Sequence, residues 1–138
     1  MKRTALTLLL IILVALAVVP AAAEEAMPDI LHMEIQLLPE YDQPGVLVIF
    51  LIQLDPELDY PLPFSVDIPA SAGAPNAVAN MNAAGQLISI PYERSVDGAE
   101  AAIEFLTNSP VIQIEYYDPN LLTNRDEKTF NFANAFST

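Results

Sequence analysis

The feature that most constrains the fold is the apolar run at Gly45–Leu54, which reads GVLVIFLIQL. From Val46 to Ile52 both alternating sets of residues are apolar, so a strand formed here can bury both of its faces. β-Branched, aromatic and leucine side chains favour a strand over a short helix. The run is too short to cross a bilayer as a helix. We therefore expect a central strand, either inside a sheet or beneath a covering layer.

Residues 1–23 have the pattern of a secretory signal peptide. A positive pair, Lys2 and Arg3, precedes an apolar run over Ala5–Val19. The segment Ala21–Ala23 then matches the small-x-small rule for cleavage by signal peptidase. We expect cleavage directly after this segment.

The remaining chain, residues 24–138, has the length of a single domain with its own core. We expect it to be secreted or otherwise extracytoplasmic, at the cell surface or in the periplasm. An uncleaved anchor is the alternative, because the apolar N-terminal segment approaches the length of a membrane span. An extension beyond Thr138 would be the other route by which the protein meets a membrane.

Charge and cysteine content exclude several classes of function. The chain has 18 Asp and Glu against 5 Lys and Arg, a net charge of −13. Nucleic acids and anionic lipids would be repelled, so neither is an expected partner. The sequence contains no cysteine, which excludes disulfides, thiol catalysis and thiolate metal sites. The fold must therefore be held by its hydrophobic core alone.

Short segments of alternating polarity, separated by turns rich in proline and glycine, follow one another along the chain. The expected strands cover residues 31–37, 46–52, 64–68, 77–81, 87–92, 101–105, 111–117 and 129–136. Asp97-Gly98 marks a hairpin, and Pro91 marks an edge strand. No helix is indicated. The pattern predicts an all-β, antiparallel β-sandwich of immunoglobulin-like type, although spacing alone separates a sandwich poorly from a barrel.

Four segments carry a resemblance to a known kind of domain. They read PEYDQPGVLVI at 39–49, AGAPNAVA at 72–79, GQL at 85–87 and EYYDP at 115–119. Together they resemble an uncharacterised exported bacterial β-sandwich domain, which in longer relatives forms the membrane-distal part of a surface protein. The resemblance implies a fold and an extracytoplasmic location, and it implies no catalytic residues. This chain departs from the longer pattern by ending at Thr138.

No arrangement of residues predicts an active site. His32 is the single histidine and lies on the polar side of the first expected strand. A catalytic triad would need a nucleophile and a carboxylate around it, and the sequence has no Gly-x-Ser-x-Gly elbow. One histidine without cysteine also disfavours zinc. We expect no enzyme, no catalytic residue and no cofactor. A hydrolase using two carboxylates is the last alternative, because any two of the eighteen acids could be paired.

An acidic loop raises the question of calcium. Asp55, Glu57 and Asp59 place three carboxylates two residues apart, and calcium prefers several oxygen ligands from a flexible loop. The helical-hand pattern is absent, and Pro56 stiffens the loop. A second oxygen-rich loop lies within residues 118–128. Acidic loops on an acidic protein are usually solvated, so we expect no metal, with these three residues as the candidates if one binds.

Tyrosines are the candidates for ligand binding. Tyr41, Tyr60 and Tyr117 could stack on a sugar, although the sequence lacks tryptophan, the best platform for such contacts. Tyr116 and Tyr117 are adjacent and must point to opposite faces of a strand. We expect a non-enzymatic, exported structural or interaction module whose partner is another protein or a polysaccharide. The alternative is a carbohydrate- or calcium-dependent binding module.

Overall fold

Eight of the described strands form two antiparallel sheets, one of five strands and one of three, and the two short strands that follow them in the chain pair with each other. The computed structural model describes residues 27–120, 122–123, 128–129 and 132. The strands are β1 (Ile30–Pro39), β2 (Val46–Leu54), β3 (Leu62–Pro69), β4 (Ala77–Met81), β5 (Leu87–Ser89), β6 (Glu93–Asp97), β7 (Glu100–Thr107), β8 (Val111–Asp118), β9 (Leu122–Thr123) and β10 (Lys128–Thr129), with one 3-10 turn, η1 (Ala70–Ala72). The expected signal peptide, residues 1–23, lies outside the described residues. Within the described part of the chain, no helix has the length and apolarity needed to cross a membrane.

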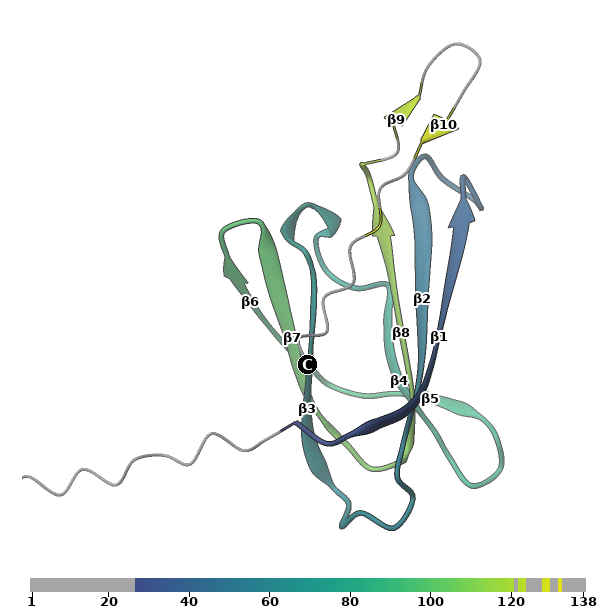
Figure 1. Ribbon diagram of the computed structural model, residues 1–138, viewed down its shortest axis with the longest axis vertical. Helices are drawn as coiled ribbons and strands as arrows, with labels where there is room; N and C mark the ends of the chain where they lie inside the picture. Colours follow the sequence, from purple (N-terminus) through teal and green to yellow (C-terminus); the bar gives the residue numbers. More distant parts are fainter. Residues whose placement is uncertain (1–26, 121, 124–127, 130–131, 133–138) are drawn as a thin grey trace, which may run out of the picture.

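The two sheets pack face to face as a β-sandwich, with the order β1-β2-β8-β4-β5 on one side and β3-β7-β6 on the other (Figure 1). The order β3-β7-β6 corresponds to strands B, E and D of an immunoglobulin sandwich, and the neighbours β4 and β8 correspond to C and F. The place next to F, which strand G takes in that fold, is occupied here by β2. The predicted all-β sandwich is confirmed.

The predicted central strand is β2, which lies between β1 and β8. Its inward side chains are buried, and they pair across the ladder with inward residues of β8, such as Phe50 with Ile114. The opposite face of β2 is only half-buried: Leu47 is buried, whereas Ile49 and Leu51 are partly exposed. Polar residues of β1 and β8 lie beside these leucine and isoleucine side chains on that face. The run is therefore central in its sheet, but no second layer covers its outer face among the described residues.

A close contact explains the glycine that begins this strand. Gly45 has φ +115°, a conformation that other residues rarely adopt. A Cβ atom at this position would lie 2.7 Å from the backbone oxygen of Asp118. Glycine therefore permits the loop between β1 and β2 to pass close to the end of β8.

One expected strand is wrong in its extent. The alternation of Ile88, Ile90 and Tyr92 indicated a single strand over residues 87–92, but β5 ends at Ser89. The chain then crosses through residues 90–92 to the other sheet and forms β6, which the sequence reading missed. The reason is physical: the five residues of β6 are all exposed, so no apolar alternation marks them.

The last expected strand, residues 129–136, is described only in part. The structure places β10 at Lys128–Thr129, which shares only Thr129 with this range, and it describes the side chain of Phe132 within the range. Phe132 packs against the core, with its ring edge-on to Phe50 at a centroid distance of 6.2 Å. The aromatic C-terminal segment therefore contributes to the core through at least this residue.

Candidate functional site

The side of the sandwich that contains β5 and β6 exposes apolar residues that point toward the core side of their sheets. Ile88 pairs with the inward residue Asn80, yet its side chain is 50% exposed. Val96 pairs with the buried Ala101 and is 55% exposed. We call residues 87–92, with residues 104–108 of β7 and the turn that follows, the open flank. It combines exposed apolar surface with two hollows.

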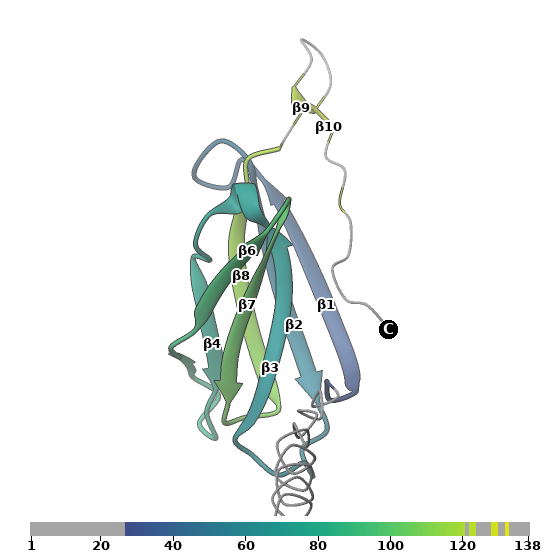
Figure 2. The same cartoon turned by 90° about the vertical axis from the view of Figure 1, so that its left-hand side faces the viewer.

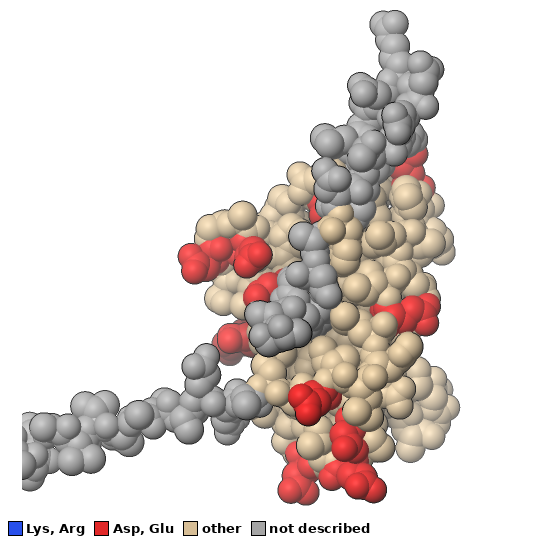
Figure 3. Space-filling model, viewed as in Figure 1, with Lys and Arg blue, Asp and Glu red and all other residues tan. Residues whose placement is uncertain are grey.

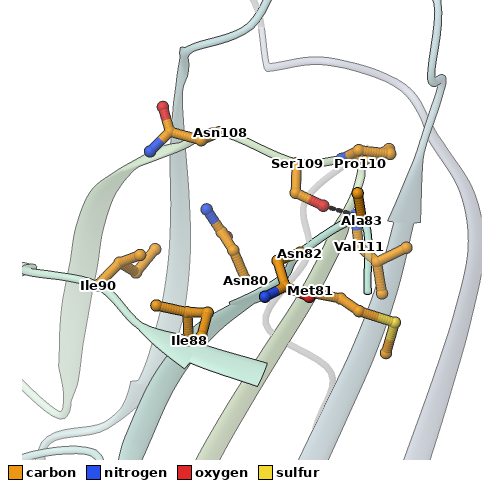
Figure 4. A pocket seen from close by; sticks show the side chains of 10 residues that line it. All are labelled: Asn80, Met81, Asn82, Ala83, Ile88, Ile90, Asn108, Ser109, Pro110 and Val111. Atoms are coloured by element: carbon orange, nitrogen blue, oxygen red, sulfur yellow. Dashed lines mark hydrogen bonds between the residues drawn. The ribbon is translucent and has the colours of Figure 1, made fainter. Parts of the chain in front are cut away.

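Two neighbouring cavities lie on this flank. The Asn80 cavity, of about 640 Å³, lies between the β4–β5 hairpin and the β7–β8 turn, as Figure 4 shows. Its lining residues are Asn80, Met81, Asn82, Ala83, Ile88, Ile90, Asn108, Ser109, Pro110 and Val111. The Tyr92 cavity, of about 740 Å³, is lined by Pro61, Pro63, Ile90, Pro91, Tyr92, Glu93, Glu104, Phe105, Leu106 and Asn108. Ile90 and Asn108 belong to both cavities, which therefore adjoin.

A buried polar pair closes the inner wall of the Asn80 cavity. Asn80 is 5% exposed, and its Oδ1 lies 3.0 Å from Oγ1 of the fully buried Thr107. This contact joins the two sheets, because β4 and β7 belong to different sheets. The amide nitrogen of Asn80 is buried and has no hydrogen-bond partner among the described residues. Buried polar groups are nearly always paired, so this amide is available to a further hydrogen-bond partner.

The Tyr92 cavity adds negative charge to apolar surface. Glu93 of β6 and Glu104 of β7 are directly paired across the ladder, an arrangement that destabilises a sheet unless a cation or solvent separates the charges. Leu106, 59% exposed, and Tyr92 provide apolar surface beside them. Neither cavity has a lysine or arginine among the described residues that line it.

The charged side chains in the described part of the visible surface are acidic as well. Figure 3 shows several groups of Asp and Glu on one face of the molecule and no Lys or Arg in the described part of that view. Arg94, on β6, is held by a hydrogen bond from its Nη2 to the carbonyl oxygen of Ala70 at 3.0 Å. On the open flank itself, Glu93 and Glu104 supply the negative charge, which favours a cationic partner.

The three carboxylates proposed for calcium lie in the loop between β2 and β3. The Asp55 carboxylate accepts a hydrogen bond from the backbone nitrogen of Glu57 at 2.8 Å, so it shapes the turn. Glu57 and Asp59 are exposed. Among the described residues no three His, Cys, Asp or Glu side chains are grouped so that they could hold a metal ion. Asp118 of the second loop is buried and accepts a hydrogen bond from the backbone of Asn120.

The candidate tyrosines are divided between the two ends of the sandwich. Tyr41 is in the β1–β2 loop, and Tyr117 on β8 donates a hydrogen bond to the carboxylate of Asp42 in that same loop. This bond is the main reason that the pKa of the Tyr117 phenol rises to about 12. Tyr60 lies in the β2–β3 loop at the other end, where its hydroxyl donates to the Asp55 carbonyl at 2.8 Å. The three do not share one face. Tyr116, as expected from its neighbour, points inward and is buried.

His32 is exposed on β1, paired with Gln53 of β2, and lies at the opposite edge of the five-stranded sheet from β5. It therefore contributes nothing to the open flank. Comparison of the chain with protein-family models, with curated proteins and with solved structures gives no match. The assignment of a site consequently rests on the geometry of the chain itself.

Sequence reasoning missed the residues of the open flank. Asn80 shares the alternation of Val78 on a short strand of small residues, so a polar side chain falls at a core position. That mismatch is the signal that could have identified it. Asn108 and Ser109 precede Pro110, and in the sequence this polar segment indicates only a break between two strands. Their place beside Ile90 depends on how the two sheets meet, which spacing along the chain does not specify.

Proposed function

We propose that this protein is a non-enzymatic, exported interaction module that binds a polypeptide partner through the open flank. The observation that carries the proposal is the exposure of apolar side chains around two adjoining cavities. Large apolar patches with polar rims are typical of binding surfaces. Ile88 lines the Asn80 cavity and Leu106 lines the Tyr92 cavity, and each is at least half exposed.

Charge specifies the kind of partner. The paired Glu93 and Glu104 line the Tyr92 cavity with no lysine or arginine among its described lining residues, and the whole chain has a net charge of −13. A partner with basic residues would gain attraction and would relieve the repulsion between these two carboxylates. Tyr92 offers a ring on which a cationic side chain can also rest. We therefore propose a segment that combines aliphatic and basic residues.

The binding test uses a labelled, capped Leu-Lys-Leu peptide, with Leu-Glu-Leu as its control, and fluorescence anisotropy as the readout. We expect Leu-Lys-Leu to bind and Leu-Glu-Leu not to bind. Leu106→Ser should weaken its binding about tenfold, the effect of removing one apolar anchor. Leu31→Ser is the matched control, because Leu31 has the same 59% exposure and lies on β1. Equal binding by both variants, or equal binding of both peptides, would contradict the proposal.

Export is proposed from the sequence pattern of residues 1–23 and from the resemblance to exported sandwich domains. N-terminal sequencing of the protein recovered outside the cytoplasm tests it. We expect the mature chain to begin at Glu24. A chain that retains Met1 in a membrane fraction would instead support the uncleaved anchor.

A further inference from the structure

The Asn80 amide defines the chemistry of the cavity that it faces. Figure 4 shows the Asn80 side chain among the lining residues, with its nitrogen directed into the space between Ile90 and Asn108. Asn80 is 95% buried, and its nitrogen has no partner among the described residues. An unpaired amide group inside a hollow is a stronger indication of a ligand than exposed apolar surface, because leaving it unpaired opposes folding.

The hydrogen bonds of Thr107 show what the ligand must offer. Its Oγ1 lies 2.7 Å from the Ser109 carbonyl oxygen and 3.0 Å from Asn80 Oδ1. One hydroxyl has one proton and cannot donate to both oxygens at once. If the Asn80 amide turns by half a rotation, its NH2 group donates to Thr107 and its oxygen faces the cavity. One polar end of the amide faces the cavity in either orientation. A ligand group that can both donate and accept a hydrogen bond pairs with the Asn80 amide in either orientation.

The other lining residues restrict the ligand further. Six of the ten have apolar side chains, and none of the ten is charged. The ligand group in this cavity is therefore neutral and mainly aliphatic. No aromatic ring is among the ten, so a sugar ring would find no stacking platform here. A peptide unit with an aliphatic side chain has the required N–H, C=O and apolar surface together.

We propose that the Asn80 cavity binds a neutral peptide unit carrying an aliphatic side chain, with the Asn80 amide as its hydrogen-bonding partner. This inference rests on the proposed function and deepens it. The shared residues Ile90 and Asn108 join this cavity to the Tyr92 cavity, where Glu93 and Glu104 lie. The partner segment thus places an aliphatic residue at Asn80 and a basic residue beside the two glutamates.

The test follows the side-chain amide signals of Asn80 by NMR during titration with N-acetyl-leucine N-methylamide. A probe of this size is expected to bind with a Kd on the order of 1 mM. We expect the Asn80 signals and the backbone signals of Ile88, Ile90 and Val111 to shift. The methyl ester of 4-methylpentanoic acid, which lacks the N–H group, should bind more weakly. No shift with the amide probe, or a larger shift with methyl glucoside, would overturn the inference.

Asn80→Leu removes the polar amide at nearly constant volume and should fold, since it also removes an unpaired buried group. We expect it to weaken binding of the amide probe at least tenfold. Asn76→Leu is the matched control at an exposed position outside the cavity.

Should Asn80→Leu fail to fold, Ile88→Asp tests the same cavity from its exposed wall. Unchanged probe binding by the folded cavity variant would overturn the inference. If Leu-Lys-Leu still binds at the Tyr92 cavity in that case, the proposed function stands without it; if that peptide binds nowhere, the proposed function itself fails.

Discussion

The five-stranded sheet has two edge strands, β1 and β5, and only a three-stranded sheet lies opposite it. In Figure 2 the strand β1 extends beyond β3, the outermost strand of the opposite sheet on that side. Met33 and Ile35 of β1 are nevertheless partly buried against the core, and Phe132 packs against Phe50 of the adjacent strand. We call this side the β1 flank.

The open flank also has inward-pointing apolar residues, but not all of them are as buried as Met33 and Ile35 of the β1 flank. Its inward residue Ile88 is half exposed, and the short crossover at residues 90–92 takes the place of a longer edge strand. Alternation along a strand determines which face a residue takes, whereas its burial depends on what the rest of the chain places over that face. One flank receives an aromatic side chain from the C-terminal segment. The other keeps two adjoining cavities.

The largest expected effect is the loss of stability caused by a substitution in the core, compared with a substitution on the open flank. Phe50 is 1% exposed and contacts Tyr116 edge-on at a centroid distance of 5.7 Å. Phe50→Ala should lower the free energy of unfolding by about 3–5 kcal/mol, as a large-to-small core change. Ile88→Ala on the open flank should lower it by less than about 1 kcal/mol. Urea denaturation measures both, and similar values would contradict the distinction.

The next effect tests whether the β1 flank is truly covered. Phe132→Ala should lower the free energy of unfolding by about 1–2 kcal/mol, because the ring is partly buried and pairs with Phe50. Leu106→Ala, an exposed aliphatic change on the open flank, is the control. A loss of stability no greater than that of the control would mean that Phe132 covers nothing.

The smallest effect concerns the outer face of β8, away from both flanks, and depends on pH. The pKa of the Tyr117 phenol is about 12 in the folded protein, against the ordinary tyrosine value of 10.0, chiefly because of its hydrogen bond to Asp42. Between these values the unfolded chain loses its proton first, so the hydrogen bond's contribution is present below pH 10.0 and lost as pH rises to about 12. The stability of the wild type relative to Tyr117→Phe should therefore fall across this window. A difference that does not change with pH would show that the bond does not form.

The sequence was sufficient for the parts of the fold that bury apolar side chains in a regular order. The double apolar run of β2, the alternation of β3 and β7, and the Asp97-Gly98 turn all predicted their elements. The missed strand β6 is exposed throughout, because it reads Glu-Arg-Ser-Val-Asp and pairs only with β7. β6 therefore forms because the Asp97-Gly98 turn pairs it with β7, and not because of an apolar alternation of its own.

The candidate site was harder to predict for a related reason. Carboxylates and tyrosines are recognisable along the chain because their chemistry belongs to the individual residue. The Asn80 cavity forms where β4 lies next to the β7–β8 turn. These segments are far apart in the sequence: Asn80 and Thr107, which contact each other there, are separated by 27 positions. An unpaired amide is a property of that arrangement, so no spacing rule could indicate it.

We propose that the open flank binds a partner, whereas Phe132 of the same chain packs beside the β1 flank. Amide hydrogen exchange with and without saturating Leu-Lys-Leu peptide tests it most directly, since exchange reports protection segment by segment. We predict that the peptide slows exchange in residues 87–92 and 104–108 and leaves residues 30–38 of β1 unchanged. Equal protection of both flanks, or protection of β1 alone, would contradict the account.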